Sequence, residues 1–278
     1  MILIGTAGYS YKDWKDVFYP EKLPNSEMLS FYAREFPFTE VNTTFYRMPN
    51  PFMLSNMAAK TPEGFRFLIK AFQGLTHKRE PALFPEFVAA LEPLIAGGKL
   101  AGVLAQFPNS FRNKPENHEY LARFREAMGP AIPVVVELRH REWTEDERTF
   151  DLLAAHDLAY TCVDEPQFKS LVPPVVRATA SPGYVRFHGR NYQKWWHPAH
   201  PDERYDYLYS GEELSEWVPR LETLASQVDT VYVSMNNHRR GQAVINGRML
   251  RELIEGQIPG VVPWGAVAPP GTEHRDAL

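Results

Sequence analysis

Eight short β-rich segments recur along the chain, and segments with helical periodicity follow most of them. The predicted strands lie at 2–7, the start of 40–49, 65–71, 101–106, 134–138, 159–163, 184–188 and 230–235. The predicted helices lie at 26–36, 50–60, 86–95, 116–128, 144–155, 210–225 and 241–255. Strands that alternate with helices are typical of a parallel sheet, and eight such units in 278 residues predict an α/β fold of the (β/α)8, or TIM, barrel type.

The segment between the sixth and seventh strands is the irregular part of this pattern. Residues 164–183 contain four prolines and no helical periodicity, so we expect an irregular crossover there. No linker or repeat interrupts 1–278, which predicts one TIM-barrel domain whose tail, from about 257, packs on the barrel with Trp264 as an anchor. A doubly wound open sheet is the alternative, but the glycine-rich fingerprint after the first strand is missing.

The composition limits the partners and the compartment. The net charge of −4 gives no reason to expect nucleic acid or an anionic membrane surface. The single Cys162 excludes a disulfide framework and a cysteine-rich metal site, and it fits a reducing cytoplasm. No apolar run reaches the ~20 residues that span a bilayer, and the N-terminus lacks a signal-peptide pattern. We therefore expect a cytoplasmic protein that does not enter a membrane.

Polar residues gather near the C-terminal ends of the predicted strands, whereas the strand starts are apolar. In a TIM barrel the catalytic residues lie at that C-terminal end, so the pattern predicts a ligand site there. With side chains alternating between the two faces of a strand, the residues expected to point inward are Thr6, Glu40, Asn42, Thr44, Tyr46, Lys70, Gln106, Glu137, Arg139, Asp164, Arg186, His188, Arg190, Ser234 and Asn236.

These inward residues include three acids and several cations, which allows two interpretations. One is a self-neutralising network of buried ion pairs, in which Glu40 is a deep partner of Lys70 or Arg186. The other is a divalent metal held by Glu40, Glu137, Asp164 and His188. The cations would compete with a metal, and no metal-binding spacing such as HExxH is present, so we assign no metal ligand and leave the cofactor open. The residues expected to be catalytic are His188, Glu137 and Asp164.

The loops after the seventh and eighth strands carry the remaining candidates. Arg190 and Trp195 lie in a long aromatic and basic loop, where the tryptophan either forms a stacking platform for a ligand or plugs the barrel. Asn236 and Asn237 are followed by Arg240 and Gly241 at a predicted helix start. That arrangement is either an anion site or ordinary helix capping with a solvated arginine pair.

Six stretches also resemble a known family, the YecE-like proteins or domain of unknown function 72. They are GTAGYSYKDWKDVFYP, EVNTTFYRMP, FPNSF, VVVELRHREW, YVRFHGRN and VYVSMNNHRRGQAVING, and they cover most of the chain in the family's order. The resemblance implies a (β/α)8 barrel, in agreement with the strand count, and it implies no activity, substrate or cofactor. Positions that match the family's pattern are Asn42, Phe45, Tyr46, Glu137, Arg139, Arg186, His188, Gly189 and Asn237.

The sequence as a whole favours an enzyme that acts on a small anionic ligand, such as a phosphorylated sugar or a nucleotide-like molecule. His188 or Glu137 would be the acid or base, and Arg139, Arg186 and Lys70 would hold the anion. A nucleic-acid-binding or nucleic-acid-processing barrel and a non-catalytic small-molecule binding protein are the alternatives. The reaction type and the oligomeric state stay unassigned.

Overall fold

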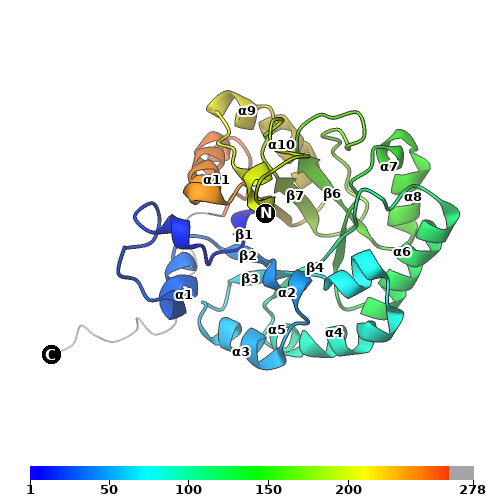
Figure 1. Cartoon of the computed structure of the whole chain (residues 1–278), viewed down its shortest axis with the longest axis horizontal. Helices are drawn as coiled ribbons and strands as arrows, with labels where there is room; N and C mark the ends of the chain where they lie inside the picture. Colours follow the sequence, from blue (N-terminus) through cyan, green and yellow to red (C-terminus); the bar gives the residue numbers. More distant parts are fainter. Residues whose placement is uncertain (263–278) are drawn as a thin grey trace.

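The computed structural model describes residues 1–262 and contains a closed, all-parallel barrel of eight strands in sequence order (Figure 1). The strands are β1 (Ile2–Ala7), β2 (Phe38–Val41), β3 (Arg66–Lys70), β4 (Leu100–Gln106), β5 (Val134–Glu137), β6 (Ala159–Asp164), β7 (Gly183–Phe187) and β8 (Val231–Met235). β8 pairs with β1 along five residues and closes the cylinder. The predicted TIM barrel is confirmed.

Helices surround the barrel in a ring (Figure 1). They are α1 (Met28–Tyr32), α2 (Thr43–Tyr46), α3 (Pro51–Ala59), α4 (Phe84–Ala90), α5 (Glu92–Ala96), α6 (Pro115–Met128), α7 (Glu142–Glu145), α8 (Arg148–Ala155), α9 (Gly211–Ser215), α10 (Val218–Ala225) and α11 (Gln242–Ile254). Prolines split two of the predicted helices, because Pro93 and Pro219 each lie at the start of a new helix.

The sequence matches the capping-box pattern twice, at Thr144 with Glu147 and at Ser210 with Glu213, and the two matches have different outcomes. Ser210 and Glu213 form the expected reciprocal capping box at the start of α9. The expected box of Thr144 with Glu147 is wrong, because the Thr144 hydroxyl donates to the carbonyl of Arg141 inside the preceding turn. The crossover between β6 and β7 contains no helix, as the prolines predict.

β2 is shorter than predicted. The strand ends at Val41, Asn42 adopts a right-handed helical conformation, and Thr43–Tyr46 form the short helix α2. Side-chain alternation therefore stops after Glu40, and the expectation that Thr44 and Tyr46 continue its inward row is wrong. A helical turn replaces the last strand residues and turns Tyr46, which is 74% exposed, towards solvent.

The barrel interior has its own apolar cluster, separate from the layer between strands and helices. Its members are Leu3, Phe38, Leu68, Ala101, Leu104, Val135, Ala159, Tyr184 and Tyr232. Counting by twos from these residues gives the true inward face of each strand. On that count Thr6 faces outward, against the expectation, and its hydroxyl bonds the phenol of Tyr32 on α1.

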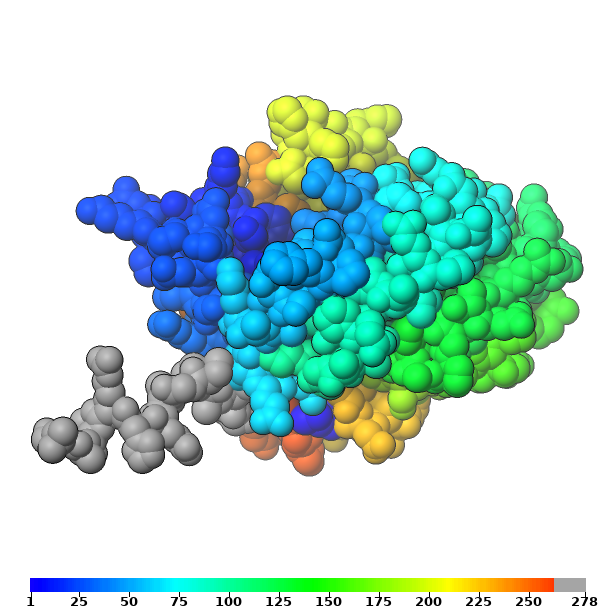
Figure 2. All heavy atoms as spheres, turned by 90° about the horizontal axis from the view of Figure 1, so that it is seen from below, coloured from blue at the N-terminus to red at the C-terminus, as the bar shows by residue number. Residues whose placement is uncertain are grey.

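The end of the chain that the structure describes packs under the barrel. The backbone N–H of Ile2 donates to the carbonyl of Gly260, and the carbonyl of Ile2 accepts from the N–H of Val262. Ile258 is buried. The predicted anchor Trp264 lies outside the described residues. At the opposite side of the molecule, the loop between β7 and α9, coloured yellow, rises above the barrel (Figure 2). Within 1–262 no helix combines the length and the apolar character needed to cross a bilayer.

Candidate functional site

A chain of charged side chains crosses the barrel interior above the apolar cluster, and Arg186 on β7 lies at its centre. Its Nη2 and Nε donate to the two oxygens of Glu40 on β2, at 2.7 and 2.9 Å. Its Nη1 donates to Glu137 on β5 at 2.5 Å. All three side chains are at most 1% exposed. Glu40 is therefore the deep partner of Arg186 that the charge count predicts.

Glu40 is held from two further sides. The phenol of Tyr184 and the hydroxyl of Ser234 both donate to its Oε2, the latter at 3.3 Å. Because every bond of this cluster is internal to the protein, Glu40 and Arg186 form the floor of the site. A buried ion pair of this kind depends on its hydrogen bonds, and here each guanidinium nitrogen of Arg186 and both carboxylate oxygens of Glu40 have a partner.

Arg139 continues the chain of charges towards the mouth of the barrel. Its Nε lies 2.5 Å from Glu137 Oε1, and its Nη1 donates to Glu165 at 2.9 Å. The Arg139 side chain keeps 12% of its surface exposed, so it reaches the mouth. Glu165 was missed by sequence reasoning, although counting by twos from Ala159 along β6 would have placed it inward.

The protonation of this network follows from its composition. Burial acts to raise the pKa of Glu137, but Arg139 and Arg186 outweigh it and hold that pKa well below its usual range. Burial raises the pKa of Glu165 to about 8, against the pull of Arg139 and with the help of Glu137. At neutral pH Glu165 therefore keeps its proton, and two carboxylates face two guanidinium groups.

His188 is buried beside Glu137. Its Nε2 lies 3.4 Å from Glu137 Oε1, and its Nδ1 accepts from the amide of Asn236 at 2.9 Å. An amide N–H only donates, so the neutral ring carries its hydrogen on Nε2. Burial, followed by repulsion from Arg139, lowers the pKa of His188 to about 3. The imidazole is therefore neutral at physiological pH, the form that a general base needs.

Lys70 differs from the other inward charges because no carboxylate pairs with it. Within residues 1–262 Lys70 forms no ion pair, and its Nζ lies 4.5 Å from the centre of the Phe45 ring. The side chain is partly exposed. Burial, with repulsion from Arg186 next, lowers the pKa of the ammonium group to about 7.

Further polar atoms at this end of the barrel are buried without a hydrogen-bond partner. They include Asn42 Oδ1 and Glu165 Oε1. Buried polar atoms are almost always hydrogen-bonded in folded proteins, so each such atom needs an explanation. A ligand that donates to Asn42 Oδ1 and accepts from the protonated carboxyl of Glu165 would supply one.

Two other predicted binding residues have protein partners. The Gln106 amide donates to the carbonyl of Phe107 at 2.8 Å and stays partly exposed. The Thr44 hydroxyl donates to the carbonyls of Val41 and Lys70, at 2.9 and 2.6 Å, so it ties the ends of β2 and β3 together. Gln106 lines the mouth, whereas Thr44 supports it from outside.

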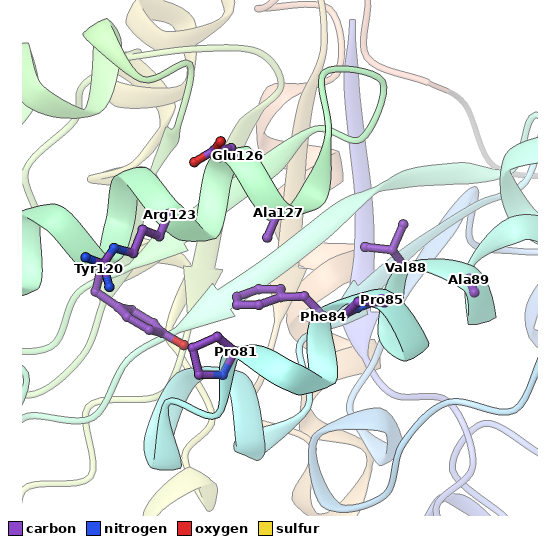
Figure 3. Close-up of a pocket in the computed structure, with 9 residues that line it drawn as sticks. All are labelled: Pro81, Phe84, Pro85, Val88, Ala89, Tyr120, Arg123, Glu126 and Ala127. Atoms are coloured by element: carbon purple, nitrogen blue, oxygen red, sulfur yellow. The ribbon is translucent and has the colours of Figure 1, made fainter.

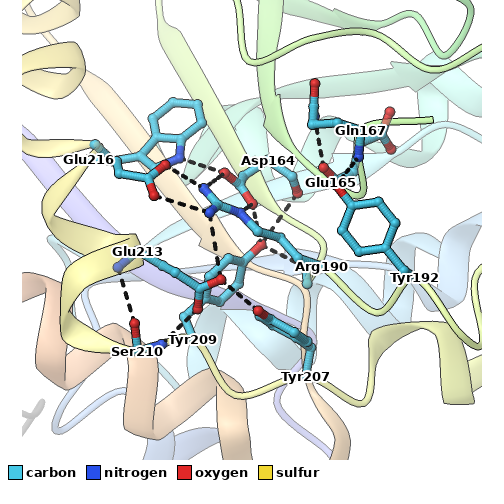
Figure 4. Close-up of polar contacts among 12 residues, drawn as sticks. Asp164, Glu165, Gln167, Arg190, Tyr192, Tyr207, Tyr209, Ser210, Glu213 and Glu216 are labelled. Atoms are coloured by element: carbon cyan, nitrogen blue, oxygen red, sulfur yellow. Dashed lines mark hydrogen bonds and ion pairs between the residues drawn. The ribbon is translucent and has the colours of Figure 1, made fainter. Parts of the chain in front are cut away.

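Asp164 and Arg190 do not face the barrel interior, which corrects their expected orientation (Figure 4). Asp164 lies one position after the inward Val163 and points to the helices. It accepts from Tyr209 and from Trp217, each at 2.8 Å, and from Arg190 at 2.7 and 2.9 Å. This cluster ties the β7 loop to the helices behind it. Asp164 therefore leaves the set of candidate catalytic residues.

The aromatic loop after β7 covers the barrel mouth. Trp195 is 3% exposed, and its ring centre lies 6.4 Å from those of His188 and Tyr205. The neighbouring Trp196 is 46% exposed. Trp195 thus plugs the top of the barrel beside His188 instead of offering a free stacking face.

The loop after β8 matches ordinary capping more closely than an open anion site. Asn237 donates to Tyr207 and Asn246. Arg240 donates its backbone N–H to Asp13 and approaches Asp206 with its guanidinium at 3.3 Å. Gly241 has φ +74° and precedes the first residue of α11, a conformation that favours glycine. The charges near this helix start are already paired within the protein.

Two cavities lie near the barrel wall. One, of about 610 Å³, lies between α4 and α6 and is lined mostly by apolar groups such as Phe84 and Val88 (Figure 3). The other, of about 220 Å³, is polar and follows the ends of β3 and β4, with His77, Arg79 and Lys114 among its lining residues. The His77 ring packs at 4.9 Å on Phe45, so this cavity begins next to the ring that contacts Lys70.

The acids considered above as metal ligands do not point to one common position. Glu40 and Glu137 are bridged by Arg186, and Asp164 points the other way. Across the part of the chain that the structure describes, no group of three or more His, Cys, Asp or Glu side chains is placed to hold a metal ion.

Comparison with known protein sequences identifies the family of this chain. A family model described as "Protein of unknown function DUF72" matches residues 3–270. The chain is 35% identical to the UPF0759 protein YunF of Bacillus subtilis over 280 residues, covering 95% of this chain and 98% of that protein. It is 27% identical to the UPF0759 protein YecE of Escherichia coli over 158 residues, covering 54% of each.

Solved structures of similar proteins share the barrel. A DUF72 family protein from Thermotoga maritima has a TM-score of 0.84 and 38% identity, over 92% of this chain and 99% of that one. A DUF72 family protein from Enterococcus faecalis has a TM-score of 0.83 and 25% identity, over 92% of this chain and 96% of that one.

Proposed function

The chain belongs to the DUF72 family of TIM-barrel proteins, and we propose that it is an enzyme whose site lies at the C-terminal mouth of the barrel, where such barrels place their sites. It would act there on a small anionic ligand, such as a phosphorylated sugar or a nucleotide-like molecule. The observation that carries the proposal is a group of polar atoms at this end of the barrel that have no hydrogen-bond partner within residues 1–262: Asn42 Oδ1, Glu165 Oε1 and Lys70 Nζ, which contacts the Phe45 ring.

The charges at the mouth support an anionic ligand. Glu165 holds its proton at neutral pH, so it does not cancel the charge of Arg139. Arg139 is partly exposed, and its guanidinium presents several N–H donors. Asn42, Gln106 and Asn236 lie at the C-terminal ends of β2, β4 and β8, from which their side chains would orient the ligand. Glu137 and His188, in contact next to Arg139, form the pair proposed for proton transfer.

Asn42 gives the sharpest test, because its Oδ1 makes no bond that folding depends on. We expect phosphate and phosphorylated sugars to raise the melting temperature of the native protein, and Asn42→Ala to remove most of that shift with little change in stability. Asn56→Ala, an exposed asparagine on α3, is the matched control. If no anion shifts the melting temperature, or if both variants respond like the native protein, the proposal fails.

Mass spectrometry of the protein purified under native conditions provides an independent measurement. A co-purifying anion that is lost in Asn42→Ala and kept in Asn56→Ala would identify the ligand. Turnover of that compound, or tight retention without turnover, then separates an enzyme from a non-catalytic binding protein.

A further inference from the structure

Lys70 has the placement of a reactive amine. It ends β3 on the inward face, two residues after Leu68 of the interior cluster, and its side chain keeps contact with solvent. The carboxylates near it are committed elsewhere: Glu40 bonds Arg186, and Glu137 contacts both Arg186 and Arg139. An ammonium group in this position lacks the counter-charge that buried lysines normally require.

The remaining charged groups around Lys70 act in both directions. Arg186 and Arg139 disfavour its protonated form, whereas Glu40 and Glu137 favour it. Lys70 in turn contributes, after burial, to lowering the pKa of His77, which lies in the loop after β3. Burial decides the balance and brings the pKa of the amine to about 7. At pH 7 a far larger share of the molecules therefore carries a free amine than for a lysine with the ordinary pKa.

We propose that Lys70 is the nucleophile of this site and that its amine forms an imine with a small carbonyl compound that also carries an anionic group. The inference rests on the proposed function, because it names the reactive part of the anionic ligand proposed for the same mouth. An amine activated by desolvation and by a neighbouring cation is a recognised nucleophile for carbonyl substrates.

The step balances without an added oxidant or reductant. The lone pair of Lys70 Nζ forms a bond to the carbonyl carbon, and the π electrons of the C=O bond move to oxygen, which takes the proton that the nitrogen releases. The C–O bond then breaks, the oxygen takes up a proton from solvent and leaves as water, and a protonated imine remains. Asn42 and Lys70 directly follow the paired residues Val41 and Ile69 on the neighbouring strands β2 and β3, and the unpartnered Asn42 Oδ1 is an acceptor suited to the positive charge of that imine.

The adjoining cavity suits the anionic part of such a compound. It is lined by His77, whose ring packs on Phe45, holds about 220 Å³, and includes Arg79 and Lys114 in its lining. Phe45 therefore connects Lys70, whose Nζ lies 4.5 Å from its ring centre, with His77 in the lining of the cavity that holds these two cations. A carbonyl carbon at Lys70 with a phosphate or carboxylate directed past Phe45 would contact both.

Reductive trapping tests the inference. The native protein is incubated at pH 7 with dihydroxyacetone phosphate and sodium borohydride, which delivers a hydride to the imine carbon and fixes the adduct as a secondary amine. Peptide mass spectrometry then locates it. We expect Lys70 to be labelled at least about tenfold more than the exposed Lys12 and Lys169. Lys70→Arg keeps a positive charge and should abolish the selective label, and excess inorganic phosphate should reduce it.

Two outcomes separate this inference from the proposed function. If phosphate raises the melting temperature while labelling is spread evenly over exposed lysines, the anion site stands and the nucleophile is wrong. If glycolaldehyde, an uncharged aldehyde, labels Lys70 selectively while no anion shifts the melting temperature, the nucleophile stands and the anionic ligand is wrong. Uniform labelling of the lysines, together with no effect of anions on the melting temperature, overturns both the nucleophile and the anionic ligand.

Discussion

Arg186 binds Glu40 through two parallel hydrogen bonds, Nη2 to Oε1 at 2.7 Å and Nε to Oε2 at 2.9 Å, in the centre of the barrel. The two residues are 146 positions apart in the chain and come from β2 and β7. Neither side chain is more than 1% exposed, so the pair cannot exchange its bonds for bonds to water. It fixes the floor on which Glu137 and Arg139 are arranged.

Removing the guanidinium should therefore destabilise the fold strongly. Arg186→Met keeps the length of the side chain but leaves Glu40 and Glu137 without their shared partner. Breaking a buried pair in this way typically costs about 3–5 kcal/mol, which we expect as a loss in the free energy of unfolding in urea. The control is Arg148→Met, whose exposed side chain pairs with Asp146 and should change stability little. Equal effects of the two substitutions would contradict a structural role for Arg186.

His188 should make stability depend on pH below neutrality. Its pKa is lowered from 6.5 to about 3 on folding, so between these values the unfolded chain binds a proton that the folded protein does not. The contribution of His188 is therefore complete above pH 6.5 and decreases as the pH falls. We expect the difference in unfolding free energy between the native protein and His188→Gln to shrink by about 1.4 kcal/mol per pH unit between pH 5.5 and 4.5. A difference independent of pH would show that the imidazole titrates normally.

Glu165 should show the opposite dependence. Its pKa is raised from 4.5 to about 8, so the folded protein holds a proton that the unfolded chain releases within this window. The stabilisation is complete below pH 4.5 and is lost as the pH rises towards 8. Relative to Glu165→Gln, which imitates the protonated acid, the native protein should lose stability by up to about 1.4 kcal/mol per pH unit between pH 5.5 and 7.5. Urea unfolding of both proteins at these pH values measures the trend, and a trend of the reverse sign would mean that Arg139 keeps Glu165 ionised.

Asp164 should behave as a structural residue. Asp164→Asn retains one acceptor oxygen and leaves Tyr209, Trp217 and Arg190 to compete for it, so we expect a loss of about 1–3 kcal/mol in unfolding free energy. Because Asp164 faces away from the mouth, ligand-induced shifts in melting temperature should persist. Glu216→Gln, which alters the more exposed partner of Arg190, is the matched control and should have a smaller effect. Loss of ligand response with unchanged stability would return Asp164 to the binding site.

The sequence by itself determined the architecture. Strand propensity, helix periodicity and chain length are local signals repeated eight times, and a parallel sheet of eight such units has few ways to bury its faces. The same local signals placed Arg186, Glu137 and Lys70 on the inward face, since alternation along a regular strand follows from backbone geometry alone.

Tertiary structure decided what those residues do. Alternation failed where β2 ended, so Thr44 and Tyr46 left the inward row when α2 began at Thr43. On β6 alternation held, but the closed barrel decides that Ala159 faces inward, which turns Asp164 outward and Glu165 inward. The pairing of each acid with an arginine depends on distances between strands that are far apart in sequence. These distances determine which charged side chain stays without an ion-pair partner. Lys70 is the residue that this pairing leaves without a carboxylate, because closing the barrel gave both nearby carboxylates to arginine.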